Sequence, residues 1–250
     1  MPRIKQNQIK WLLLLIPASL LPKPMNCLAQ PVTKPSPAKP NIIYVFADQW
    51  RAQATGYNGD PNLKGKTPNL DRIASHSVNF TNAISVCPFC TPYRASLLTG
   101  QYPTSTGMIF NDVQLPVASL TMAKIFKASG YQTAYIGKWH LDGMGRFEFT
   151  PPARRQGFDY WKALECSHEY NNLLYYTGNT DEKHYWEGYG PYAETKDAIQ
   201  YINLHAKGKT PFLLFLSYYR HDIYRLGPHL LIHGRQLLKD LLTVLSHLEA

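Results

Sequence analysis

A short run of residues around Cys90 has the residue types and the spacing of a reactive site. In the stretch CPFCTPYRASLLTG, residues 87–100, Pro92 lies where the first turn of a helix accepts proline, and Gly100 is placed to end that helix. Cys90 therefore lies at the expected helix start, where unpaired backbone N–H groups favour negative charge and bound anions. Arg94 lies one turn further along the same face and can bind an anion held there. The segment predicts an anion site beside a cysteine.

Cys87 and Cys90 also form a Cys-x-x-Cys pair, which is the spacing of a redox motif or of half a zinc site. A redox pair is expected to follow a strand in a thioredoxin-like unit, and the sequence has no second Cys-x-x-Cys to complete a zinc site. Cys27 and Cys166 are the other cysteines, so an exported chain cleaved after residue 29 has an odd number of thiols. A thiol–disulfide protein stays open as an alternative.

Further polar side chains follow three apolar runs, at the points where these runs stop. Continuous apolar runs of this kind are typical of strands buried on both faces. They cover residues 41–47 (NIIYVFA), 132–136 (QTAYI) and 212–217 (FLLFLS). Asp48 follows the first run, Lys138 and His140 follow the second, and residues 220–222 (RHD) follow the third. Parallel sheets place their chemistry beyond the carboxyl ends of their strands, so we expect these three loops to meet.

Helical signals alternate with these strands. Thr67 followed by Pro68 is typical of a helix cap and first helical residue, and Ser119 is expected to cap a second helix that ends before Gly130. A further helix is expected to begin at Thr195. Strands that alternate with helices predict an α/β fold, in which a mainly parallel sheet is sandwiched between helices.

The amino-terminal residues resemble an export signal. A basic start precedes the apolar core at residues 11–21, which is shorter than the roughly 20 apolar residues of a membrane span. We therefore expect residues 1–29 to be a signal peptide, and residues 30–40 to be a proline-rich linker in a periplasmic or secreted protein without a stable membrane span. The basic residues of this start are Arg3, Lys5 and Lys10.

Net charge gives no reason to expect a nucleic-acid partner. The chain has 26 basic and 17 acidic residues, a formal net charge of +9. Four of these basic residues and none of the acids lie in the first 30 residues, which leaves +5 for the remainder. A scattered charge of this size does not form the basic stripe that nucleic-acid binding requires.

The run CTPYRASLLTG, residues 90–100, resembles the signature of the type I, formylglycine-dependent sulfatases, in which Cys-x-Pro-x-Arg precedes a glycine. The resemblance extends from Pro40 to about Tyr224 and implies an alkaline-phosphatase-like fold for residues 41–224. Its further landmarks are PNII and ADQ within residues 40–49, TPNLD at 67–71, GKWH at 137–140 and GFD at 157–159. Residues 217–224 resemble the family's Ser…Pro-His-x-Pro segment, but Arg220 and Ile223 replace the prolines.

The resemblance implies a cofactor and a modified residue. Cys90 would be oxidised by a dedicated formylglycine-generating enzyme to formylglycine (3-oxoalanine), whose hydrate attacks the sulfur of a sulfated small molecule or glycan. Ca²⁺, with Mg²⁺ as an alternative, would be held by Asp48, Gln49 and the residue at position 90, because carboxylate and amide oxygens suit a hard cation.

The resemblance also assigns roles to the surrounding bases and acids. Arg94 and Lys138 would hold the anionic oxygens of the ester. His221 or Lys138 would bind the substrate and protonate the leaving alcohol. His140 would take a proton from the modified residue, so that sulfate is expelled and the aldehyde returns.

Residues 165–186 form an aromatic and polar stretch that includes His168. Rings with hydrogen-bonding tips suit a sugar or an aryl group, which makes His168 a candidate substrate-binding residue. An ordinary insertion that packs on the domain explains the stretch equally well.

The last residues differ from the family pattern. Members supply the second half of the calcium site, an Asp followed by Asn or His, from a later strand, whereas residues 225–250 predict an atypical amphipathic helical tail without that motif. We therefore expect a truncated product with an incomplete sheet and a weak calcium site, a loss that could leave this chain inactive. A non-catalytic sulfate-binding fragment, and a phosphatase or phosphonate hydrolase of the same superfold, stay open as alternatives.

Overall fold

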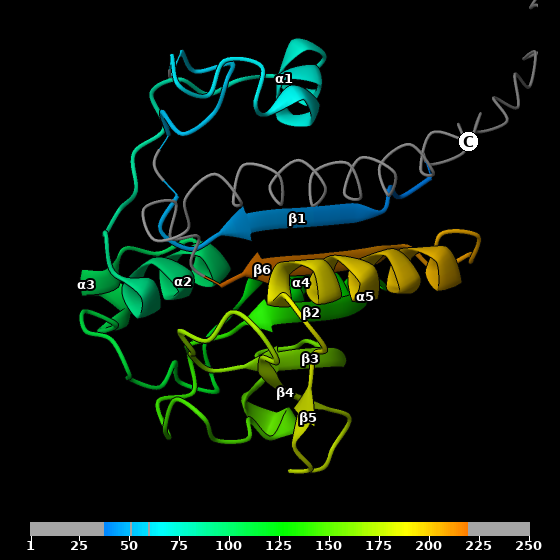
Figure 1. Cartoon of the computed structure of the whole chain (residues 1–250). Helices are drawn as coiled ribbons and strands as arrows, with labels where there is room; N and C mark the ends of the chain where they lie inside the picture. The colour runs from blue at the N-terminus through cyan, green and yellow to red at the C-terminus, as the bar shows by residue number, and fades with distance from the viewer. Residues whose placement is uncertain (1–37, 51, 60, 220–250) are drawn as a thin grey trace, which may run out of the picture. The chain divides into compact units, whose positions relative to one another are not determined.

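The computed structural model describes residues 38–50, 52–59 and 61–219, and within them a six-stranded sheet in the order β1-β6-β2-β3-β4-β5 (Figure 1). β1 (Ile42–Ala47), β6 (Phe212–Tyr218), β2 (Gln132–Lys138) and β3 (Tyr160–Leu164) are parallel neighbours in that order. β4 (Leu174–Thr177) and β5 (His184–Tyr185) extend the sheet with antiparallel pairing. The predicted α/β fold with a mainly parallel sheet is confirmed.

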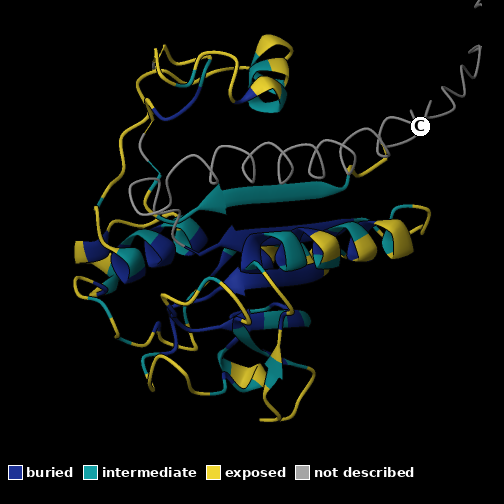
Figure 2. Ribbon diagram, viewed as in Figure 1, coloured by how far each residue is buried: buried dark blue, intermediate teal, exposed yellow. Residues whose placement is uncertain are grey.

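Helices cover both faces of this sheet, as predicted. α5 (Gly190–His205) packs on one face, and α2 (Cys90–Thr99) and α4 (Met122–Ala128) pack on the other. Successive side chains of β6 point to opposite faces of the sheet. Leu214 and Leu216 pack in the core under α5, and Leu213 and Phe215 pack in the core on the other face. Figure 2 shows the most buried residues concentrated in β6 and β2.

β1 differs from the prediction that it is buried on both faces. Each of its six residues is only partly buried, because β6 is its only strand neighbour in the described part of the chain. A continuous apolar run indicates contacts on both faces, but it does not indicate whether a strand is flanked on both edges.

Three predicted helix starts are corrected or refined by the structure. The second predicted helix is capped by Thr121 rather than Ser119, because Thr121 Oγ1 accepts from the N–H of Lys124 and also donates to the carbonyl of Gln156. α5 begins at Gly190, five residues before Thr195, since proline is tolerated in its first turn. Thr67 precedes α1 (Pro68–Ser75) as expected, but its hydroxyl makes no capping bond.

Short helical turns connect these elements, namely α3 (Pro103–Thr106) and a 3-10 turn, η2 (Pro152–Arg154). Among the described residues no helix has the length and apolar character needed to cross a bilayer. Most of the predicted signal peptide and linker, residues 220–224 of the predicted domain and the predicted tail 225–250 lie outside the described residues.

The carboxyl ends of β1, β6 and β2 point toward α2 and α3 (Figure 1). The sheet therefore brings the residues after β1 and β2 to the amino end of α2. These are the elements that position the site.

Candidate active site

α2 presents Cys90 at its first turn, as the sequence predicts. The helix begins at Cys90 after an extended residue, Phe89, and ends at Gly100, whose φ of 68° is the left-handed conformation that glycine adopts without strain. Phe89 provides no side-chain cap for the helix, although Asn111 Oδ1 accepts from the Thr91 N–H at 3.0 Å. The dipole of this helix start favours negative charge near Cys90.

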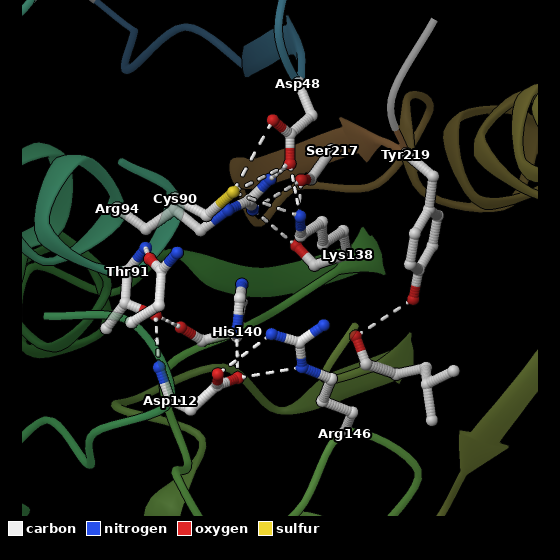
Figure 3. Close-up of polar contacts among 12 residues, drawn as sticks. Asp48, Cys90, Thr91, Arg94, Asp112, Lys138, His140, Arg146, Ser217 and Tyr219 are labelled. Carbon is white, nitrogen blue, oxygen red and sulfur yellow. Dashed lines mark hydrogen bonds and ion pairs between the residues drawn. The ribbon is translucent and has the colours of Figure 1, made fainter. Parts of the chain in front are cut away.

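Asp48, Cys90 and Lys138 meet at the carboxyl edge of the sheet (Figure 3). The Cys90 thiol lies 3.6 Å from Asp48 Oδ2, and Lys138 Nζ lies 3.4 Å from Cys90 Sγ. Lys138 also forms an ion pair with Asp48 Oδ2. A sulfur at the helix start is thus flanked by one carboxylate and one ammonium group.

Arg94, one turn further along α2, forms hydrogen bonds with residues around this group. Its guanidinium donates to the Lys138 carbonyl at 2.6 Å and to Ser217 Oγ at 2.8 Å, and it reaches Asp48 Oδ2 at 3.4 Å. The residue is only 3% exposed, so these bonds replace the water that a guanidinium normally binds. Arg94 therefore ties α2 to the ends of β1, β2 and β6 at once.

The charges around Asp48 keep it ionised. Burial alone would raise the pKa of Asp48, but the positive charges of Arg94 and Lys138 outweigh burial and hold that pKa below its ordinary value. The same burial strengthens the attraction among the three groups, because water screens them little.

His140 lies just beyond β2 and is 2% exposed, with a φ of 57°. Its Nε2 lies 2.7 Å from Asp112 Oδ1, and Nδ1 has no hydrogen-bond partner among the described residues. Burial lowers the pKa of His140 to about 4, and the positive charges of Lys138 and Arg94 act in the same direction. Figure 3 shows the imidazole between Asp112 and the group formed by Cys90, Arg94 and Lys138.

Asp112 and Arg146 are site residues that sequence reasoning missed. Arg146 Nε donates to Asp112 Oδ1 at 3.1 Å, and its Nη2 donates to Oδ2 at 2.9 Å. These bonds, together with the hydrogen bond to His140, lower the pKa of Asp112 to about 2. Both residues lie in loops, where no apolar period or strand end marks a position, so the sequence gives no signal for them.

Glu165 is a third missed residue, and it holds the backbone that follows His140. Its carboxylate accepts from the N–H groups of Leu141, Asp142 and Gly143 at 3.0–3.2 Å. Burial raises the pKa of Glu165 to about 7, although these backbone donors favour the ionised form. The signal was available, since Glu165 directly follows the apolar strand β3.

A cavity of about 620 Å³ opens beside this group. Asp48, Cys90 and Arg94 line it together with Gln49 and the aromatic side chains of Phe46, Trp50, Phe89 and Tyr93. Its size is within the range of cavities that take small ligands, and it combines apolar walls with a few charged groups.

The predicted metal ligands come together only in part. Asp48 and Cys90 are neighbours and Gln49 lines the same cavity, but the described residues hold no group of three or more His, Cys, Asp or Glu that could bind a metal ion. Ca²⁺ prefers about six to eight oxygen ligands, whereas Asp48 and Gln49 offer oxygens from two side chains and Cys90 a sulfur. The described residues therefore fit calcium in the type of donor at Asp48 and Gln49 but not in number.

Among the described residues, no further predicted residue joins this site. His168 is exposed in the loop after β3 and takes no part in the described polar contacts around Cys90. His221 lies outside the described residues. Cys87 and Cys90 are both free thiols, so the structure does not form the disulfide of the redox alternative.

The fold and the site together define a class: an α/β protein that gathers a helix-initial cysteine, a lysine, an arginine and an aspartate at the carboxyl edge of a parallel sheet. Comparison with known proteins narrows that class. The family described as Sulfatase matches residues 40–223. An ulvan-active sulfatase from Formosa agariphila is 60% identical over 181 residues, which are 72% of this chain and 35% of that protein. The chain belongs to the sulfatase family.

Solved structures agree with this membership. The crystal structure of yidJ from Bacteroides fragilis matches with a TM-score of 0.70 and 35% identity, over 77% of this chain and 46% of that one. A structure solved in complex with its substrate D-glucosamine-2-N,6-O-disulfate matches with a TM-score of 0.62 and 30% identity, over 72% and 34%. The chain spans about a third of the length of the curated relatives it matches.

Proposed function

We propose that this chain hydrolyses sulfate esters through a formylglycine formed from Cys90. The observation that carries the proposal is the position of Cys90 at the start of α2, with Lys138 Nζ 3.4 Å from its sulfur and the Asp48 carboxylate 3.6 Å away. A helix start with an adjacent ammonium group stabilises an oxyanion at this position and holds a sulfate beside it. A dedicated formylglycine-generating enzyme is the maturation partner in this proposal.

The basic residues place the ester for attack. Lys138 Nζ contacts the residue at position 90 directly, and the Arg94 guanidinium adds a second positive charge next to Asp48. The sulfate oxygens therefore have two cations within reach. One hydroxyl of the hydrated aldehyde gives its proton to the adjacent Asp48 carboxylate as its oxygen attacks sulfur. The ester S–O bond breaks, and the alcohol leaves with a proton from Lys138 or from His221. Position 90 then carries a covalently bound sulfate and one remaining hydroxyl.

His140 completes the cycle. It takes the proton of that remaining hydroxyl, the freed electron pair forms the aldehyde C=O, and the C–O bond to sulfate breaks. His140 is suited to this role because its low pKa keeps it neutral at pH 7, with a lone pair available. Water then hydrates the aldehyde again.

Calcium belongs to the same proposal, with Asp48 and Gln49 as its ligands in this part of the chain. When bound, the ion would neutralise charge on the sulfate group. Because the described residues supply too few oxygens for calcium, other ligands have to come from substrate, from water or from residues outside the described ranges. None of the steps above depends on the ion.

The proposed substrate is a sulfated glycan or a sulfated small molecule. The relative from Formosa agariphila is named for its activity on ulvan, and one structural neighbour binds a sulfated glucosamine. The cavity beside Cys90 has aromatic walls, which suit the apolar faces of a sugar ring or an aryl group. The signal-like residues 1–29 support export to the periplasm or beyond as part of this proposal.

The test is turnover of an aryl sulfate and of the matching aryl phosphate by the chain co-expressed with a formylglycine-generating enzyme. We expect release of the phenol from the sulfate ester in preference to the phosphate ester, loss of this activity in Cys90→Ala, and retention in the matched variant Cys87→Ala. Preference for the phosphate ester would support the phosphatase alternative. Sulfate binding without turnover, or equal loss in both cysteine variants, would contradict the proposal.

A further inference from the structure

We propose that Asp112 is a positioning residue that keeps His140 in the Nε2–H tautomer, so that Nδ1 is the atom that accepts the proton when sulfate is released from residue 90. The proposal rests on the proposed function for the identity of the reaction. The tautomer itself rests on the geometry around His140 and is testable without turnover.

The first observation is the arrangement of the two ring nitrogens. Nε2 lies 2.7 Å from Asp112 Oδ1, whereas Nδ1 is buried without a hydrogen-bond partner among the described residues. A buried ring nitrogen that carries a proton and has no acceptor loses the hydrogen bond that it would make in water, so the proton belongs on Nε2. The unprotonated Nδ1 is then a free acceptor within the site.

The second observation is the role of Arg146. Its guanidinium contacts both oxygens of Asp112, at 3.1 Å and 2.9 Å, in a bidentate pair. This pair keeps Asp112 ionised and fixes the plane of its carboxylate. An ionised carboxylate only accepts hydrogen bonds, which requires His140 Nε2 to be the donor.

The third observation ties this pair to α2, the helix that begins with Cys90. The Thr91 hydroxyl donates to the His140 carbonyl at 3.0 Å and accepts from the Asp112 N–H at 3.3 Å. Asp112, His140 and the helix start are thus joined through the residue that follows Cys90. Figure 3 shows the imidazole on the Cys90 side of Asp112, and the charges of Lys138 and Arg94 act on it directly.

This arrangement assigns the proton in the release step. The hydroxyl proton of sulfated residue 90 moves to His140 Nδ1, the O–H electron pair forms the aldehyde C=O, and the C–O bond to sulfate breaks. The resulting imidazolium keeps its Nε2–H bond to Asp112, whose negative charge stabilises it. Loss of Asp112 therefore affects the release of sulfate and not the earlier release of alcohol.

The experiment compares Asp112→Asn with Asp159→Asn, which is the same chemical change at a distant position. Asp159 precedes the amino end of β3, away from the carboxyl ends of the strands that form the site, and its carboxylate pairs with Lys127. The first readout is ¹⁵N NMR of the histidine side chains at pH 7, with the His140 signals assigned by their loss in His140→Gln. The second readout is steady-state turnover of an aryl sulfate, together with the mass of the peptide that contains residue 90 during turnover.

We expect the Nε2–H tautomer in the unchanged protein and in Asp159→Asn, and a gain of Nδ1–H in Asp112→Asn. We also expect kcat to fall about 100-fold or more in Asp112→Asn, with KM falling in parallel, because the sulfated form of residue 90 accumulates. Asp159→Asn should match the unchanged protein in both readouts.

Two results would overturn the inference: the same His140 tautomer in all three proteins, or a loss of kcat/KM without accumulation of sulfated peptide. Absence of turnover in the unchanged protein would contradict the proposed function, and the NMR comparison would still decide the role of Asp112.

Discussion

Asp48 and Lys138 are 90 residues apart in the sequence and form an ion pair at the carboxyl edge of the sheet, across β6, which separates their strands. Lys138 is 3% and Asp48 12% exposed, so the pair is held largely away from water. Its position beside Cys90 makes it both a structural link between strands and part of the candidate site.

Asp48→Asn should destabilise the fold by about 3–5 kcal/mol, because Lys138 and Arg94 would keep buried charges without their carboxylate partner. Urea unfolding measures this, with the exposed Asp181→Asn as the matched control, expected within about 0.5 kcal/mol of the unchanged protein. The pKa of Asp48 is lowered in the folded state, so its contribution is present above the ordinary carboxyl pKa and is lost as the pH falls through the folded value. A gap between the two proteins that widens on acidification would contradict this account.

Arg94→Lys should lower both activity and stability. Lysine keeps the charge but cannot bond the Lys138 carbonyl, Ser217 Oγ and Asp48 together, so we expect a loss of about 2–4 kcal/mol of unfolding free energy. We also expect kcat/KM for an aryl sulfate to fall about 100-fold or more. The exposed Arg72→Lys on α1 is the control for both measurements. Equal unfolding midpoints for the two variants would show that the multiple bonds of Arg94 contribute nothing.

Gly137→Ala should disrupt the sheet next to the site. A Cβ at Gly137 would lie 2.0 Å from the Ser217 carbonyl oxygen, and the φ of 103° is closed to residues with a side chain. We expect a loss of about 3–5 kcal/mol by urea unfolding. Gly178→Ala is the matched control, because its φ of 59° is also positive but nothing lies within 4 Å of the added atom. Its cost should be about 1 kcal/mol, and equal costs at both positions would refute the steric explanation.

Glu165 should give the folded protein a measurable dependence on pH. Its folded pKa of about 7 exceeds the ordinary value of 4.5, so the folded state holds the proton more tightly. The raised pKa of Glu165 adds about 3 kcal/mol to the free energy of unfolding below pH 4.5. This contribution is lost as the pH rises from 4.5 to about 7. Urea unfolding at pH 5 and pH 7.5 should show this decrease in the unchanged protein, and Glu165→Gln should lack that part of it. An identical decrease in both proteins would exclude Glu165 as its source.

The sequence predicts the parts of the site that follow directly from strand ends and helix signals. Asp48 and Lys138 are found because each ends an apolar run, and Cys90 and Arg94 because Pro92 and Gly100 delimit their helix. Local patterns of this kind are sufficient to place these side chains at one edge of a parallel sheet.

The parts that the sequence did not reveal depend on tertiary packing. Ser119 and Thr121 are both residue types that cap helices, and the bond from Thr121 to the Gln156 carbonyl favours the second. Asp112 contacts His140 from a loop 28 residues away, and neither spacing nor hydropathy marks that contact. The partial burial of β1 depends on its place in the sheet order, which its own residues do not encode.

The most direct test of the central claim is the mass of the peptide that contains residue 90, isolated from the chain after co-expression with a formylglycine-generating enzyme. We predict a peptide that has lost its sulfur and reacts with a carbonyl-specific hydrazide reagent. An unmodified thiol at Cys90, or a disulfide from Cys90 to Cys87, would contradict the account.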